Sequence, residues 1–385
     1  MTDAPQTPAP RRTRRPLSRR RKVLFSLALG ALTLGLVEGI ARIGEWQRAR
    51  RRSARTEAHY DTGLVARDGT PITQEAGGVQ LVLDPELTFR LLPGHTAPGI
   101  SINADGFRGP PLRPRGEAFR VLLTGGSTAF GWGASSDAAC VAPHLQAELE
   151  RAWGRPVEVL NAGVPSYRLA EEFDLVCLRG LDHEPDLVVS LTGYNDLFQA
   201  FKGNQSGGNQ LFDQLELQLT EAYALGPALL MSSALGRRVM RRLHARPPVG
   251  EAPDRAETEA RFLRLARRLS AACEGKLLLA LQPLYAEHDP AARPEAERAR
   301  LARYFLPWGD EGPQFLAYTR EALDRWRPGL AALEAQGLRW VDLSRAFADF
   351  PEVAFDDPCH LSDAGNAYLA RALAEAIQHH PAAPR

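Results

Sequence analysis

The stretch FRVLLTGGSTAF, residues 119–130, indicates the fold class of this 385-residue chain. A run of apolar residues ends in two glycines and Ser127, and a helix is expected to begin near Ala129. A buried strand that turns through glycines into a helix is typical of a parallel α/β sheet, which binds its ligands at the carboxyl ends of the strands. Ser127 therefore has a position that suits a nucleophile, although the pattern alone also fits an ordinary glycine turn or a phosphate-binding loop.

Four further apolar runs repeat this pattern towards the C-terminus. Amphipathic stretches separate them, such as the one in which Phe262, Ala266, Leu269 and Cys273 recur at steps of three and four residues. Short apolar runs that alternate with helices predict a parallel sheet covered by helices on both faces. We therefore expect a three-layer α/β/α sandwich around a five-stranded parallel sheet. Its strands are predicted at residues 119–124, 157–162, 186–192, 276–282 and 338–343.

Polar groups follow two of these strands at the same edge of the predicted sheet. The second strand ends in NAG, residues 161–163, and the third is followed by GYND, residues 193–196. The Gly163 N–H and the Asn195 side-chain amide can converge with the Ser127 N–H on a developing oxyanion, as acyl transfer requires. Taken alone, each of the two turns is more simply explained by a structural role.

A histidine with a nearby carboxylate lies close to the C-terminus, in FDDPCHLSDAG, residues 355–365. His360 comes three residues after Asp357 and shortly before an expected helix. A loop this short can fold the carboxylate onto the imidazole, so that Asp357 holds Nδ1–H while Nε2 accepts the Ser127 proton. Asp356 is the alternative orienting acid, and a position next to a helix cap is the non-catalytic explanation for His360.

Together the four blocks resemble the SGNH or GDSL hydrolase superfamily over residues 118–377. The resemblance implies a flavodoxin-like sheet and a serine ester hydrolase that uses neither a metal nor another cofactor. Residue by residue, it implies a catalytic triad of Ser127, Asp357 and His360 and an oxyanion hole formed by Ser127, Gly163 and Asn195. The chain departs from the family's name at Gly126, where the name has Asp.

The resemblance leaves the acceptor of the acyl group open. The expected partner is an ester-bearing substrate, such as an exported or cell-surface O-acylated glycan, with lipid and small-molecule esters as alternatives. An O-acyltransferase of surface polysaccharide would form the same acyl-enzyme, and a non-catalytic carbohydrate-binding or assembly protein would use the same scaffold. Hydrolysis is favoured over the non-catalytic alternative because the full set of site residues is present.

The N-terminal region predicts attachment to a membrane. Residues 1–22 form a basic tail, and residues 23–43 are mainly apolar and lack an A-x-A-like cleavage site after them. We therefore expect an uncleaved signal anchor with a single membrane-spanning helix. Nucleic-acid binding would also explain the basic run, but the adjoining apolar stretch favours a membrane flank. SINADGFRGP, residues 101–110, resembles a membrane-anchored bacterial branch of the family, which implies a catalytic domain outside the cytoplasm.

The rest of the chain divides into a spacer with an N-terminal decoration, residues 44–117, and a catalytic domain, residues 118–382. Insertions near residues 197–254 and 284–312 are long enough to cap a pocket. The composition, 44% hydrophobic and 24% charged, excludes disorder as the dominant state. The four cysteines lack C-x-x-C spacing, which argues against a structural zinc site and leaves their pairing and the oligomeric state open.

Overall fold

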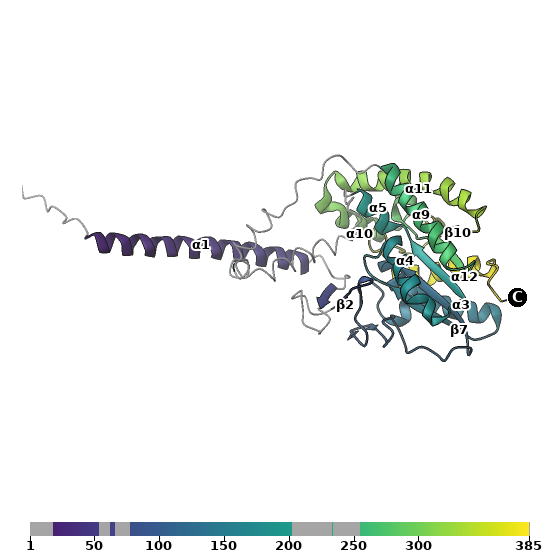
Figure 1. The fold of residues 1–385 in the computed structure, drawn as a ribbon. Coiled ribbons are helices and arrows are strands. Elements are labelled where there is room, and N and C mark those ends of the chain that lie inside the picture. Colours follow the sequence, from purple (N-terminus) through teal and green to yellow (C-terminus); the bar gives the residue numbers. More distant parts are fainter. Residues whose placement is uncertain (1–17, 54–61, 66–77, 202–232, 234–254, 385) are drawn as a thin grey trace, which may run out of the picture. The chain divides into compact units, whose positions relative to one another are not determined.

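The computed structural model describes residues 18–53, 62–65, 78–201, 233 and 255–384 (Figure 1). Contacts divide the chain into two compact units. The first comprises Met1–Arg55 and Thr220–Arg246, and the second comprises Thr56–Leu219 and Pro247–Arg385. All residues predicted for catalysis belong to the second unit.

The described part of the first unit contains a long apolar helix, α1 (Arg19–Ser53). Its segment Arg19–Gly44 is long and apolar enough to cross a membrane, and leucine and isoleucine side chains along it are exposed. Membrane anchors and signal sequences both have such a helix near the N-terminus. Glu38 and Arg42 lie one helical turn apart and pair at 2.8 Å, which offsets the charges near the end of the apolar run.

A five-stranded parallel sheet forms the centre of the second unit, which confirms the predicted fold class. Its strands are β6 (Phe119–Gly125), β7 (Val157–Gly163), β8 (Leu187–Thr192), β9 (Leu277–Leu281) and β10 (Arg339–Asp342). They lie in the order β10-β9-β8-β6-β7, so the direction in which strands are added reverses after β7. The carboxyl ends of β6 and β8 therefore flank the topological switch point, where open α/β sheets bind their ligands.

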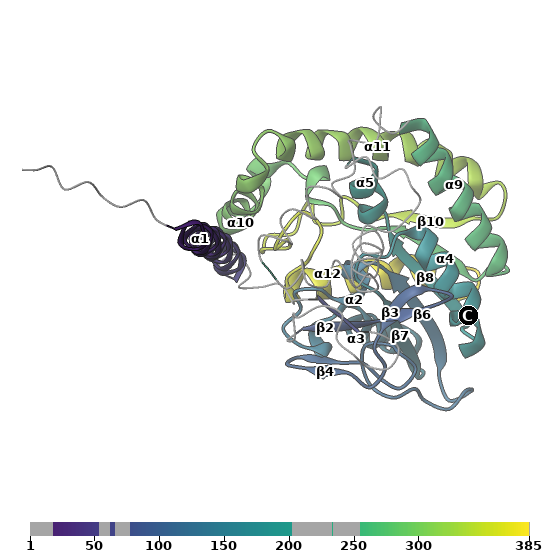
Figure 2. The same ribbon diagram turned by 60° about the vertical axis from the view of Figure 1, so that its left-hand side comes forward.

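Helices cover both faces of the sheet and complete three layers (Figure 2). These helices include α3 (Val141–Trp153), α4 (Leu169–Leu178), α9 (Arg255–Ala272), α11 (Glu311–Glu334) and α12 (Asp363–Gln378). Side chains alternate between the faces of a strand, so Val121 and Leu123 of β6 pack with α3 and α12, whereas Leu122 packs with α4, α9 and α11.

Short strands precede the central sheet, within the region predicted as spacer and decoration. They are β1 (Thr62–Val65), β2 (Val79–Asp84), β3 (Thr88–Leu91), β4 (Thr96–Ala97) and β5 (Ile100–Ser101). β2 pairs parallel to β1 and antiparallel to β3, and Leu81 and Phe89 are buried in the same apolar cluster as α4. The Tyr167 hydroxyl donates to Phe89 O at 2.5 Å, which joins this segment to the catalytic domain.

The two predicted insertions are described to different extents. Of the first, α5 (Tyr194–Phe201) marks the beginning, and residues 202–232 and 234–254 lie outside the described part of the chain. The second contains α10 (Glu295–Phe305), whose buried Glu297 pairs with Arg293 at 2.7 Å. Glu297 Oε2 also accepts the Phe355 N–H at 3.1 Å, so this insertion supports the chain just before Asp357.

All four cysteines are free thiols, of which Cys140, Cys273 and Cys359 are buried and Cys177 is half-buried.

Candidate active site

The nucleophile candidate lies on a glycine turn between β6 and the short helix α2 (Ser127–Phe130). A Cβ on Gly125 would lie 2.4 Å from Leu191 O, so a side chain there would collide with the neighbouring strand. A Cβ on Gly126 would lie 2.4 Å from Asn195 Nδ2. Gly126, which replaces the Asp of the family's name, therefore leaves room for the Asn195 amide beside the nucleophile.

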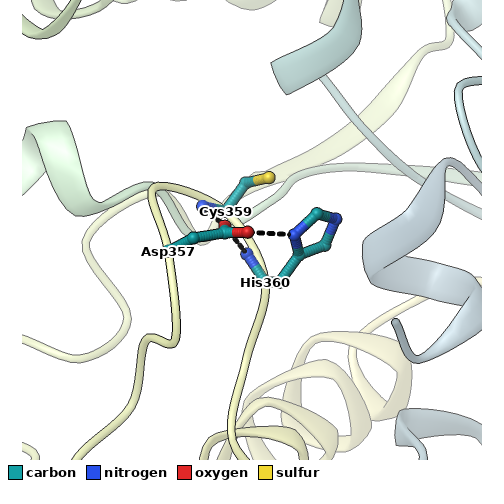
Figure 3. Close-up of side chains that lie close together, drawn as sticks. All are labelled: Asp357, Cys359 and His360. Carbon is teal, nitrogen blue, oxygen red and sulfur yellow. Dashed lines mark hydrogen bonds and ion pairs between the residues drawn. The ribbon is translucent and has the colours of Figure 1, made fainter. Parts of the chain in front are cut away.

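Ser127, His360 and Asp357 form a continuous hydrogen-bonded line. His360 Nε2 lies 2.7 Å from Ser127 Oγ, and His360 Nδ1 lies 2.5 Å from Asp357 Oδ2. The second carboxylate oxygen accepts the N–H groups of Cys359 at 3.0 Å and of His360 at 2.9 Å (Figure 3). Because the loop directs the carboxylate at Nδ1, the other ring nitrogen faces the serine hydroxyl and is placed to accept its proton.

The Asp357 carboxylate remains ionised although it is buried. Burial raises the pKa of Asp357, but the adjacent His360 and the N–H groups of Cys359 and His360 outweigh burial and hold that pKa below its usual range. Asp356, the alternative acid, pairs instead with Arg300. The structure thus brings Asp357 to the imidazole and Asp356 to a guanidinium group.

Of the two remaining candidates for the oxyanion hole, Asn195 follows β8 and Gly163 is the last residue of β7. Asn195 Nδ2 donates to Tyr167 O at 2.7 Å, which holds the amide beside the nucleophile turn. The Gly163 N–H donates to Asn161 Oδ1 at 3.1 Å. A Cβ on Gly163 would lie 2.2 Å from Phe130 N, so this glycine is needed for the close approach of β7 to α2. Gly163 thus contributes packing under the nucleophile, and its N–H is already engaged.

A further contact between the nucleophile turn and the histidine loop has no signal in the sequence. The Thr128 hydroxyl donates to Cys359 O at 3.1 Å and accepts from Gln282 Nε2 at 2.8 Å. Gln282 directly follows β9, and Thr128 and Cys359 are far apart in the chain, so no local motif marks the bridge. The bridge connects the residue after Ser127 to the residue before His360.

Residues 123–368, more than half of the chain, match the sequence profile of the GDSL-like Lipase/Acylhydrolase family. The chain belongs to this family. It is accordingly a hydrolase of ester bonds. No curated protein matches this GDSL family member at a significant level.

Several solved structures are similar to this GDSL family member. A protein of the G-D-S-L family from Desulfitobacterium hafniense is 11% identical, with 67% of this chain and 99% of that chain covered and a TM-score of 0.38. An acetylxylan esterase from Geobacillus stearothermophilus is 15% identical, with 68% and 94% covered and a TM-score of 0.35. A two-domain esterase active on acetylated mannans is 14% identical, with 70% and 52% covered and a TM-score of 0.38.

Aromatic and thiol groups surround the triad candidates in this GDSL family member. The ring of Trp132 is half-buried and its centroid lies 6.1 Å from that of His360. The Cys359 thiol is buried and lies within 4.8 Å of an Asp357 carboxylate oxygen. Burial and the Asp357 charge raise the pKa of Cys359 well above its usual range, so the thiol stays protonated.

Two acids with raised pKa values belong to the helices α4 and α5: Glu172 is buried and Asp196 is half-buried. Glu172 Oε2 accepts the Ser190 hydroxyl at 2.6 Å, and burial raises the pKa of Glu172 to about 8. Burial also raises the pKa of Asp196 to about 6, against the opposing effects of Arg168 and the Leu169 N–H. Glu172 is therefore mainly neutral at pH 7, which lowers the cost of placing a carboxyl group there.

Asp357, Cys359 and His360 also bring three atoms of metal-binding types within 4.8 Å of one another. His360 directs Nδ1 at Asp357 and Nε2 at Ser127, so both ring nitrogens are engaged. This set of donors therefore fits proton transfer better than metal binding.

Proposed function

We propose that the protein is a serine acylesterase in which Ser127, His360 and Asp357 form the catalytic triad. The observation that carries the proposal is the unbroken line from Ser127 Oγ through both ring nitrogens of His360 to Asp357 Oδ2, with separations of 2.7 and 2.5 Å. Ser127 Oγ attacks the ester carbonyl carbon while His360 Nε2 takes the serine proton and passes it to the departing alcohol. Water then repeats the sequence and releases the carboxylic acid.

The Ser127 N–H and the Asn195 amide are the proposed oxyanion donors. Ser127 is the first residue of α2, where N–H groups have no acceptor within the helix. The bond of Asn195 Nδ2 to Tyr167 O leaves the amide a second N–H, since a primary amide has two. Gly163 enters this proposal as the residue that lets α2 pack closely on β7.

The proposed substrate is an O-acylated glycan outside the cytoplasm. The basic residues before α1 support a signal anchor with an N-terminus in the cytoplasm and a catalytic unit on the other side of the membrane. The Trp132 ring beside His360 supports a sugar substrate, because aromatic rings offer a flat apolar surface to sugar C–H groups. Protease protection in spheroplasts and N-terminal sequencing of the mature protein test the topology and the retention of α1.

The test of the reaction compares detergent-solubilised full-length protein with its Ser127→Ala variant. Hydrolysis of 4-nitrophenyl acetate and labelling by a fluorophosphonate should both be lost in the variant. Folded wild-type protein that neither turns over the ester nor takes the label would refute the triad. Addition of a glycan acceptor distinguishes the transferase alternative, since acetylated glycan would then form faster than free acetate.

A further inference from the structure

The motif SINADGFRGP, residues 101–110, contains none of the triad residues but forms a defined turn. Asn103 Oδ1 accepts the N–H groups of Asp105 and Phe107, each at 3.0 Å. This turn delivers Arg108 to the carboxyl end of β7, and only 1% of the Arg108 side chain is exposed. A buried arginine is costly unless its donors and its charge are satisfied, so its surroundings indicate what it holds in place.

The Arg108 guanidinium contacts the end of the nucleophile helix. Nη1 donates to Phe130 O at 3.2 Å and to Gly131 O at 2.9 Å. Nη2 donates to Gly99 O at 2.9 Å, and Nε donates to Asp137 Oδ1 at 2.7 Å. Each nitrogen of the fork therefore has an acceptor, and two of the acceptors are carbonyl groups at the C-terminal end of α2.

A four-residue helix cannot maintain its own position, because one helical turn gains too few internal hydrogen bonds to offset its ordering. Its terminal carbonyl groups also need donors from elsewhere and favour a cation. Asn161 Nδ2 supplies one donor to Phe130 O at 3.1 Å, and Arg108 supplies the others together with the positive charge. We propose that Arg108 is a positioning residue that, through α2, holds Ser127 Oγ within reach of His360.

The counter-ion of Arg108 extends this connection to the histidine side of the site. Asp137 Oδ2 accepts both the N–H and the hydroxyl of Ser101, at 2.9 and 2.5 Å. In the same loop, the N–H and hydroxyl of Ser135 donate to Asp363 at 2.9 and 2.5 Å. Asp363 begins α12, the helix that follows the histidine loop. The loop that contains Ser135 and Asp137 thus connects the motif at residues 101–110 both to α2, which carries Ser127, and to α12, which follows the His360 loop.

The test exchanges Arg108 for lysine in the full-length protein, which keeps the charge and removes the fork of donors. A matched control exists in Arg120, a buried arginine at the amino end of β6. Arg120 Nε donates to Glu158 at 2.9 Å, and its other nitrogens donate to His183 O at 2.8 Å and to Arg113 O at 2.6 Å. Arg120→Lys removes a similar set of guanidinium hydrogen bonds. It does so at the amino end of β6, whereas Ser127 follows the carboxyl end of that strand.

We expect Arg108→Lys to lower kcat by about 100-fold with KM changed by less than about threefold, because a displacement of about 1 Å is enough for such a loss. The rate constant of fluorophosphonate labelling should fall by the same factor. Arg120→Lys should lower the thermal midpoint comparably and leave kcat within about twofold. Equal kcat values for the two folded variants would overturn the proposal.

The inference rests on the proposed triad, and the experiment separates the two. If the Ser127→Ala variant keeps the turnover of the wild type, the triad itself is refuted. If turnover is lost in Ser127→Ala but unaffected in Arg108→Lys, only the positioning role is refuted. Should Arg108→Lys fail to fold, Asp137→Asn weakens the ion pair between Arg108 and Asp137 by changing Asp137, the more exposed of the two residues. That variant should lower kcat by at least about threefold, and an unchanged kcat would contradict the role of Arg108.

Discussion

Exchanging Asp357 for asparagine should remove the base function of His360 while the protein stays folded. The asparagine oxygen can still accept the N–H groups of Cys359 and His360, which lie 3.0 and 2.9 Å from the present Oδ1. The asparagine Nδ2 would then take the place of Oδ2, 2.5 Å from His360 Nδ1, where two N–H groups would oppose each other. The imidazole is expected to move its proton to Nε2, which then cannot accept the proton of Ser127.

An imidazole in the wrong tautomer lowers kcat by about 10⁴, which corresponds to about 5 kcal/mol in activation free energy. The assay is the hydrolysis of 4-nitrophenyl acetate by full-length protein, with thermal unfolding measured on the same samples. The control is Asp356→Asn, which alters the pair with Arg300 and should keep kcat within about threefold. A loss in Asp356→Asn as large as that in Asp357→Asn would refute the assignment of the orienting acid.

Three further predictions concern pH and the nucleophile turn. Turnover should fall at acidic pH, because protonated His360 cannot accept the serine proton, and a rate that stays constant down to about pH 4 would exclude this base. Burial raises the pKa of Glu172 from 4.5 to about 8, so folded protein retains a proton that the unfolded chain releases, and the free energy of unfolding should decrease as the pH rises between those values. In Glu172→Gln, the free energy of unfolding measured with urea should fall by about a few kcal/mol less over this pH range than it does in the wild type. The same pH dependence in both proteins would show that Glu172 is ionised in the folded state. Gly126→Ala should displace Asn195 Nδ2, which a Cβ would meet at 2.4 Å, and should lower kcat by about 100-fold at little cost in thermal midpoint, whereas full activity would remove Asn195 from the oxyanion hole.

The central sheet was predictable because its inner strands, such as β8 and β9, are buried on both faces and read as nearly continuous apolar runs. The ends of β6 and β9, for example, lie within one residue of the predicted ranges 119–124 and 276–282. The apolar pieces VQLVLD and TFRL were visible in the sequence, but their pairing as β2 and β3 was not. Such short strands gain their stability from packing on α4, a contact between distant segments that local patterns do not encode.

The candidate site was accessible to sequence reasoning only where its groups are local. Asp357 and His360 share one short loop, and Ser127 follows a glycine turn, so spacing alone brings each into view. Gly163 is a glycine at the expected strand end, yet no local pattern shows that its N–H donates to the side chain of Asn161. The Thr128 bridge depends on the fold as a whole, because its partner is 231 residues away.

The distance between Ser127 and His360 depends on groups outside the helix that carries the serine. The two residues are 233 positions apart, and their 2.7 Å contact is made between a single helical turn and a loop. A single helical turn has too few internal hydrogen bonds to fix its own position, and the hydrogen bonds within the loop join His360 to Asp357 without placing it against Ser127. The contacts that do so come from Arg108 and Asn161 at one end of α2 and from Thr128 beside the serine. Loss of one such contact should therefore raise the activation free energy of turnover more than it lowers the free energy of unfolding. Turnover is sensitive to sub-ångström displacements of Ser127, whereas the stability that comes from the apolar core of the sheet is not.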